Sequence, residues 1–285
     1  MKKLFTTLSN IWKIEDLRAR ILFTLLCLLI YRIGSFIVLP GVNPASLNTE
    51  EKEGLLGLLN MFAGGSFSRA SIFALGVMPY ISASIVMQLL GIVVPYFQKL
   101  QKDGETGRKT INQLTRYLTI ILTALQATAY VSSQIAADAK IMSEPLFTIS
   151  SMFILTAGTL FVMWLGEKIT DKGIGNGISL IIMVGIIAQL PYGIFAEFAT
   201  RMEGNGGLIP FIVEIAALFF VVMFTILIVQ GVRKIPVQYA KKQVGSKQVG
   251  GVRQYIPLKV NAVGVMPIIF AQAIMFIPAT MMQFF

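Results

Sequence analysis

The feature that most constrains this chain is a series of apolar segments, each close to the length that crosses a lipid bilayer. A helix needs about 20 consecutive apolar residues to cross a hydrocarbon layer about 30 Å thick. With 55% hydrophobic and 13% charged residues, the chain is also far more apolar than a soluble domain. The sequence therefore predicts an all-α, polytopic membrane protein. The expected spans are 21–39, 76–94, 117–136, 145–165, 178–190 (ended by Pro191), 208–230 and 260–285.

The stretch 60–91 begins like a membrane span but does not continue as one. Residues 61–75 hold two adjacent glycines and Arg69, so they are too polar and too short to cross the membrane. A longer apolar segment follows, and Pro79 suits the first turn of its helix, where an N–H would be unpaired anyway. We expect a half-helix over about 61–75 and then a full helix, a broken segment that needs protein or a water-filled cavity around it. An interfacial re-entrant hairpin without a pore is the alternative.

The start of this second helix has an echo near the C-terminus. The string GVMPYI at 76–81 returns as GVMPII at 264–269. The two helices are expected to cross the membrane in opposite directions. Inverted repeats around a central pathway have this geometry.

The composition excludes several classes of chemistry. The chain contains no histidine, which removes His-based acid–base catalysis, Ser-His-Asp hydrolysis and His metal sites. The lone Cys27 lies inside the first expected span, so neither a disulfide nor a cysteine metal site can be built. An intramembrane enzyme would need a carboxylate pair or a Ser-Lys dyad, and no expected span holds one. The sequence predicts neither an enzyme nor a cofactor.

The net charge of +10 follows the expected topology. With the N-terminus inside, 19 of the 24 lysines and arginines fall on the cytoplasmic side, as the positive-inside rule requires. Residues 1–20 are basic and amphipathic, which predicts a helix lying on a surface of anionic lipids rather than a cleaved signal peptide. The other basic cytoplasmic segments are the loops 98–116, 167–173 and 231–259.

The loop 231–259 carries more charge than orientation alone requires. It holds seven positive residues and no acidic one. A solvated loop and a docking site for an anionic partner both remain open on this evidence. The candidate docking residues are Arg233, Lys234, Lys241, Lys242, Lys247 and Arg253.

A glycine-rich string, GIGNG, follows the fourth expected span at 173–177. A phosphate-binding loop would need a preceding strand and a following Lys-Ser/Thr, and neither is present. We expect a tight turn that lets two membrane helices approach closely.

Several strings together resemble the SecY family, the channel subunits of the bacterial Sec protein translocase. They are spread along nearly the whole chain: IYRIGSFIVLP at 30–40, the stretch 60–90, GETGR at 104–108, WLGEKITDKGIGNGIS at 164–179, IPVQYAK at 235–241 and YIPLKVNAVGVMPIIF at 255–270.

The resemblance implies two pseudo-symmetric halves of five helices around an hourglass pore. Residues 21–190 would form the first half and 191–285 the start of the second. A lateral gate between the second and seventh helices would release membrane spans into lipid. A plug would include Gly65, Ser66, Phe67, Ser68, Arg69, Ala70 and Ser71. A pore constriction would receive Val77, Ile81, Ile178, Ile182 and Ile269.

The resemblance also implies partners and a location. The partners would be the small subunits SecE and SecG, the SecA motor ATPase, the RNA and proteins of the ribosome, signal sequences and nascent chains. The location would be the bacterial cytoplasmic membrane. The family has ten membrane helices and this chain provides seven, so we expect it to be part of a longer product. A secondary transporter shares inverted repeats and broken helices, but it usually buries ionisable residues at midplane. Only Arg32 and Glu214 lie within the expected spans.

The topology is testable by labelling. A cysteine introduced at Ser246, in the loop with seven positive charges, should react with membrane-impermeant thiol reagents only from the cytoplasmic face. The native Cys27 lies within a span and supplies the background control. Labelling from the outside of intact cells would overturn the assignment.

Overall fold

The computed structural model describes residues 12–47, 57, 60, 63–203, 207–237, 242–244, 247–249, 254–261 and 271. These residues form seven α-helices, which confirms the predicted helical membrane fold, and two antiparallel strand pairs, which were not predicted. The chain divides into two compact units, Met1–Gly193 with Ala273–Phe285, and Ile194–Gln272. We describe each unit by itself.

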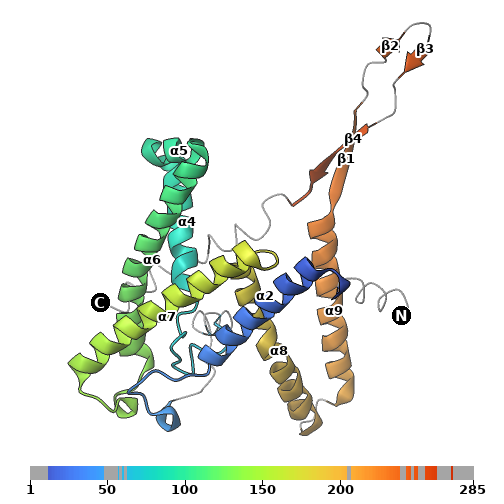
Figure 1. Ribbon diagram of the computed structural model, residues 1–285. Helices are drawn as coiled ribbons and strands as arrows, with labels where there is room; N and C mark the ends of the chain where they lie inside the picture. The colour runs from blue at the N-terminus through green and yellow to red at the C-terminus, as the bar shows by residue number, and fades with distance from the viewer. Residues whose placement is uncertain are drawn as a thin grey trace. The chain divides into compact units, whose positions relative to one another are not determined.

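The first unit contains six of the helices, the last of which continues into the second unit. Helices α4 and α6 run side by side, and the short α5 lies across their ends (Figure 1). Helix α7 packs on α2 and α6. The elements are α2 (Glu15–Gly34), η1 (Pro44–Ser46), α4 (Met78–Val93), α5 (Pro95–Lys102), α6 (Gly104–Gln134), η2 (Ala137–Ala139), α7 (Glu144–Lys172) and α8 (Gly177–Glu203).

Helix α2 corrects both ends of the first expected span. It begins at Glu15, so residues 15–20 belong to the same helix as the span and not to a separate surface helix. It ends at Gly34 instead of Leu39 because the backbone that follows pairs with residues 70–72. Residues 1–11 of the expected surface helix lie outside the described residues.

The loop predicted at 98–116 is helical. Helix α5 leaves α4 at an angle of 100°, and α6 begins at Gly104, well before the expected span. An ion pair between Glu105 and Lys109, one turn apart, supports the part of α6 that extends beyond the apolar segment. Pro79 lies in the first turn of α4, as predicted.

Hydroxyl groups line the buried face of α6 without leaving polar atoms unpaired. Thr119 and Thr123 are fully buried, and each donates its hydroxyl hydrogen bond to the carbonyl four residues earlier, at 2.7 and 2.6 Å. Because these hydroxyls are satisfied within their own helix, the face can pack closely against α4 and α7.

The predicted tight glycine turn between α7 and α8 is confirmed. A Cβ on Gly177 would lie 2.0 Å from the carbonyl oxygen of Gly166, so only glycine permits this approach of the helices. The side chain of Thr170 accepts a hydrogen bond from the N–H of Gly177 at 2.9 Å, and Asn176 caps the start of α8.

The prediction that Pro191 ends the fifth span is wrong, because α8 continues through it to Glu203. A proline inside a helix removes one backbone hydrogen bond, and a membrane helix tolerates it where neighbouring groups or local adjustments satisfy the freed carbonyl. Three helices of the described residues are long and apolar enough to cross a membrane: α7, α8 up to Met202, and α9. The bent pair α4–α5 is a fourth candidate. Helices α2, with its three arginines, and α6, rich in threonine, stay below that threshold.

The second unit contains the end of α8, helix α9 (Leu208–Gln230) and four strands. Arg201 of α8 bonds Glu197 at 2.8 Å and Glu214 of α9 at 2.6 Å, which ties the two helices together. Strand β1 (Val232–Val237) leaves the end of α9 and pairs with β4 (Gln254–Lys259), as Figure 1 shows. Strands β2 (Lys242–Val244) and β3 (Lys247–Val249) form the second pair. The basic loop 231–259 therefore contains antiparallel strand pairs, and we call it the basic ribbon. Its many charged residues gave no sign of strands in the sequence.

Candidate functional site

Residues 63–77, here called the turn segment, form consecutive turns, so the prediction of a half-helix over 61–75 is wrong. Four of these residues have left-handed backbone: Gly64 (φ 64°), Gly65 (φ 81°), Ala70 (φ 46°) and Gly76 (φ 53°). A right-handed helix cannot run through such positions. The sequence signal was present in the glycines, but the left-handed alanine carried none.

The turn segment pairs with the extended chain that follows α2. The N–H of Leu39 donates to the carbonyl of Ala70 at 2.8 Å, and the N–H of Ile72 donates to the carbonyl of Ile37 at 3.0 Å. Between these bonds Val38 and Ser71 form an antiparallel bridge. The segment thereby satisfies part of the backbone that its lack of helix leaves unpaired.

Helices α6 and α7 hold the turn segment from other directions. The hydroxyl of Tyr130 on α6 donates to the carbonyl of Phe67 at 2.6 Å, and the two rings meet edge to face at 4.8 Å. On α7, a Cβ added to Gly158 would lie 2.2 Å from the carbonyl oxygen of Ile72. Nothing larger than glycine fits there without moving the segment.

Phe73 anchors the middle of the turn segment among aromatic rings. Its ring stacks on Tyr31 of α2 at 6.1 Å and on Phe161 of α7 at 5.8 Å between centroids. It also lies against Gly34, where a Cβ would be 2.0 Å from the Phe73 ring. A large side chain of the segment thus fills a recess that two helices leave open.

Two arginines converge on one end of the turn segment. Arg69 donates to the carbonyl of Gly64 at 2.9 Å, and Arg32 of α2 reaches the same oxygen at 3.4 Å. Both guanidinium groups also lie over the ring of Phe36, at 4.5 and 4.7 Å from its centroid. Among the described residues neither arginine has a carboxylate partner. The contact therefore combines two bonds with the repulsion of two like charges.

Of the residues expected in the constriction, the structure brings three together. Val77 is buried in an apolar cluster with Phe73, and Ile81 and Ile178 pack against that cluster half-buried. Ile182 is half-buried one turn beyond Ile178 and is not a member of the cluster. Ile269 lies outside the described residues, as does the repeated string at 264–269.

The residues expected in the plug all belong to the turn segment. Five are buried (Gly65, Ser66, Phe67, Ala70 and Ser71), and Ser68 and Arg69 are half-buried. The helical contacts of Tyr130 and Gly158 with this segment were missed by sequence reasoning. A glycine within a membrane helix is a signal for close packing, but a tyrosine inside an apolar span carries no signal of its partner.

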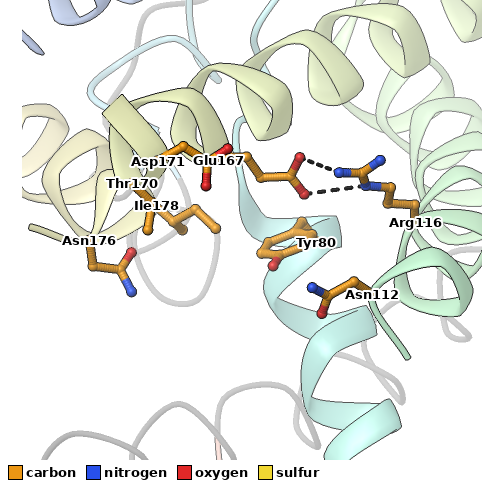
Figure 2. A pocket seen from close by; sticks show the side chains of 8 residues that line it. All are labelled: Tyr80, Asn112, Arg116, Glu167, Thr170, Asp171, Asn176 and Ile178. Atoms are coloured by element: carbon orange, nitrogen blue, oxygen red, sulfur yellow. Dashed lines mark hydrogen bonds and ion pairs between the residues drawn. The ribbon is translucent and has the colours of Figure 1, made fainter. Parts of the chain in front are cut away.

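A polar cavity of about 330 Å³ lies beside the apolar cluster that contains Val77 and Phe73. Figure 2 shows its lining, in which Arg116 of α6 and Glu167 of α7 form a two-bond ion pair (2.5 and 3.3 Å) next to Tyr80 of α4. This pair, like the cavity, was not predicted, because no spacing rule links residues 51 positions apart. The other lining residues are Asn112, Thr170, Asp171, Asn176 and Ile178. Within the described ranges, no three His, Cys, Asp or Glu side chains are grouped to hold a metal ion.

The candidate docking residues are only partly described. Arg233 and Lys234 lie exposed on β1. Lys242 belongs to β2 and Lys247 to β3, while Lys241 and Arg253 lie outside the described residues.

Comparison with known proteins gives consistent matches. The family model described as SecY matches residues 71–285. A protein translocase subunit SecY from Halalkalibacterium halodurans is 44% identical over 99% of this chain and 67% of its own length. The SecY subunit from Streptomyces scabiei is 42% identical over 99% of this chain and 68% of its own.

Solved structures show the same fold at lower identity. One titled "The structure of a protein conducting channel" has a TM-score of 0.64 at 21% identity and covers 90% of this chain. Another, Sec61 in a canine ribosome-channel complex, has a TM-score of 0.60 at 21% identity, also over 90% of this chain. The chain spans about two thirds of the curated relatives and 56% of each of these two solved chains.

The close contact between the turn segment and Gly158 of α7 can be tested by adding one methyl group at Gly158. Gly158→Ala should lower the free energy of unfolding by about 1–3 kcal/mol, because the added Cβ collides with the carbonyl of Ile72. The matched control is Gly193→Ala in α8, where a Cβ meets nothing within 4 Å and the better helix former should be neutral or slightly stabilising. Thermal unfolding in detergent measures both. Equal midpoints for the two variants would refute the close contact.

Proposed function

The chain belongs to the SecY family, and from this premise we propose that it lines and gates a channel for unfolded polypeptides. Such a channel passes secretory proteins across the membrane and releases membrane spans sideways into lipid. The observation that carries the proposal is the apolar cluster in which Val77, Ile81 and Ile178 meet Phe73 of the turn segment. These side chains come from two stretches of the chain, 73–81 at the start of α4 and Ile178 at the start of α8.

An idle pathway wide enough for an extended polypeptide must still exclude ions and water. A collar of charges would grip some substrates, whereas a narrow constriction of branched aliphatic side chains dewets and adheres weakly to any chain. Val77, Ile81 and Ile178 have the chemistry of such a collar, and we assign Ile182 and Ile269 to it from the resemblance.

Residues 65–71 of the turn segment are the plug of this channel in our proposal. The turn segment is buried against helices on several sides. Among the described residues, the hydrogen bonds that hold it come from the Tyr130 hydroxyl, the guanidinium of Arg32, two backbone bonds with Ile37 and Leu39, and two bonds to Asn60. Each neutral hydrogen bond contributes about 0.5–1.5 kcal/mol net. A set of this size can keep a segment in place and still release it when a substrate supplies competing contacts.

The rival function as a secondary transporter is not favoured. A coupled transporter uses ionisable residues at midplane. Arg32 instead reaches the carbonyl of Gly64, and Glu214 bonds Arg201 at 2.6 Å. The relatives are named protein translocase subunits. In our proposal the chain contributes no catalytic site, and its partners supply the energy.

The proposed partners follow from the family and from charge. The small subunits SecE and SecG would complete the channel, and the SecA motor or the ribosome would dock on the basic ribbon. A related channel was solved in a complex with the ribosome. We place the chain in the bacterial cytoplasmic membrane with its N-terminus in the cytoplasm, near anionic lipids. The lateral gate implied by the resemblance involves the span 260–285, most of which lies outside the described residues.

The collar can be tested by measuring ion leak through the idle channel. Ile81→Asn, in the protein as the cell makes it, should leave the fold intact and raise ion conductance through the idle channel, because an amide hydrates the constriction. It should also relax the demand for a strong signal sequence. The matched control is Ile85→Asn one turn later, where the side chain is 5% exposed. That amide should destabilise by roughly 1–3 kcal/mol without leak. Planar-bilayer conductance and thermal unfolding separate the two, and a folded Ile81→Asn variant without leak would remove Ile81 from the collar.

The docking surface is tested by reversing charge. Arg233→Glu with Lys234→Glu should weaken ribosome or motor binding severalfold, with little effect on stability because both residues are exposed on β1. Wild-type binding should also fade as salt rises. Arg108→Glu with Lys109→Glu makes the same charge change on α6 and should have less effect. Equal losses for the two variants, in a salt titration of binding to membranes, would reduce the ribbon to an orientation signal.

A further inference from the structure

The polar cavity beside the collar has a charge that its own residues do not balance. Arg116 and Glu167 neutralise each other through two bonds across the cavity. Asp171 lies one helical turn beyond Glu167, is exposed, and makes no hydrogen bond or ion pair within the described residues. Lys168 and Lys172, on the same helix, do not line the cavity. The lining therefore carries one uncompensated negative charge.

The remaining polar groups can donate or accept hydrogen bonds, so the carboxylate of Asp171 decides which ligand the cavity favours. Asn112 and Asn176 contribute side-chain amides from α6 and from the turn before α8, and Thr170 and Tyr80 contribute hydroxyls. Figure 2 shows these groups around one open space. Ammonium and guanidinium groups donate only, and a free carboxylate is their strongest partner. The cavity suits a cation better than an anion.

The cavity borders a buried apolar cluster. Tyr80 and Ile178 line the cavity and also pack against the apolar cluster that contains Val77 and Phe73. A ligand bound at Asp171 would therefore have Ile178 and the ring of Tyr80 beside its cationic group, with the buried cluster behind them. The complementary ligand has a positive charge next to an apolar run.

We infer that the cavity binds the basic N-terminal region of an incoming signal peptide, with Asp171 as the residue that reads its charge. A secretory signal peptide consists of a positively charged region followed by an apolar run of about 7–15 residues. The positively charged region matches the cavity at Asp171, and the apolar run that follows it matches the neighbouring apolar cluster. The inference rests on the proposed function, because it names the part of the substrate that this site receives.

The expected effect is modest because Asp171 is exposed. Ion pairs at exposed carboxylates contribute a small fraction of binding and are weakened by salt. Loss of the charge should therefore change rates about two- to fivefold. The arrangement would bias which precursors engage first without blocking any of them.

The test compares one precursor in two forms, with lysines or with glutamines in its basic region. Asp171→Asn should slow export of the lysine form about two- to fivefold at low salt and leave the glutamine form unchanged. Asp171→Lys should favour a third form with glutamates in that region. Asp138→Asn, an exposed carboxylate on η2, is the matched control and should change neither rate. A photo-crosslinker at Asn112 should capture the basic region of an arrested precursor and not its mature part.

The outcomes separate this inference from the proposed function. Equal slowing of both precursors by Asp171→Asn, or a crosslink from Asn112 only to the mature part, would overturn the inference and leave the channel intact. Faster export of the lysine form would show that the cavity selects anionic ligands and would also overturn it. Failure of the channel proposal would look different, because depletion of the protein would then leave export of both precursors unchanged.

Discussion

The backbone of residues 63–77 has to find hydrogen-bond partners outside a regular helix, and the first unit is arranged around that need. Four left-handed positions prevent the segment from forming a regular helix, so only short turn bonds, such as the one from the N–H of Ser71 to the carbonyl of Ser66, form within it. Its other carbonyls accept bonds from the N–H of Leu39, the hydroxyl of Tyr130 and the guanidinium of Arg32. Glycines on two helices, Gly34 and Gly158, bring it close enough for those bonds. A helical segment would satisfy itself and would need none of them.

This arrangement makes the segment both well placed and separable. Its seat is formed by surfaces of α2, α6 and α7 that do not depend on it for their own hydrogen bonds. Removing the segment would break no helix, but it would open the buried apolar clusters to which Phe67 and Phe73 belong. The two arginines at Gly64 weaken the closed position further, since their like charges share one carbonyl. In our account the channel opens by moving this segment while the helical wall keeps its packing.

Sequence reasoning reached the features that local pattern determines. Apolar length predicted the helices, Pro79 the start of α4, and the GIGNG string the close turn between α7 and α8. It failed where long-range pairing decides: α2 ends at Gly34 because the next residues pair with the turn segment. The same limit hid the Arg116–Glu167 pair and the strand pairing within the basic loop. The predicted helix end at Pro191 was wrong because proline often ends a helix but does not always do so, and α8 continues through it.

The central claim is that the turn segment must move for a polypeptide to pass. Phe67 and Tyr130 can be replaced by cysteines and joined with a short bismaleimide, since their rings lie 4.8 Å apart, with native Cys27 replaced by alanine. The account predicts that the joined protein stays sealed to ions and stops exporting precursors, while either single cysteine treated with the same reagent exports normally. Export at the normal rate by the joined protein would contradict the account.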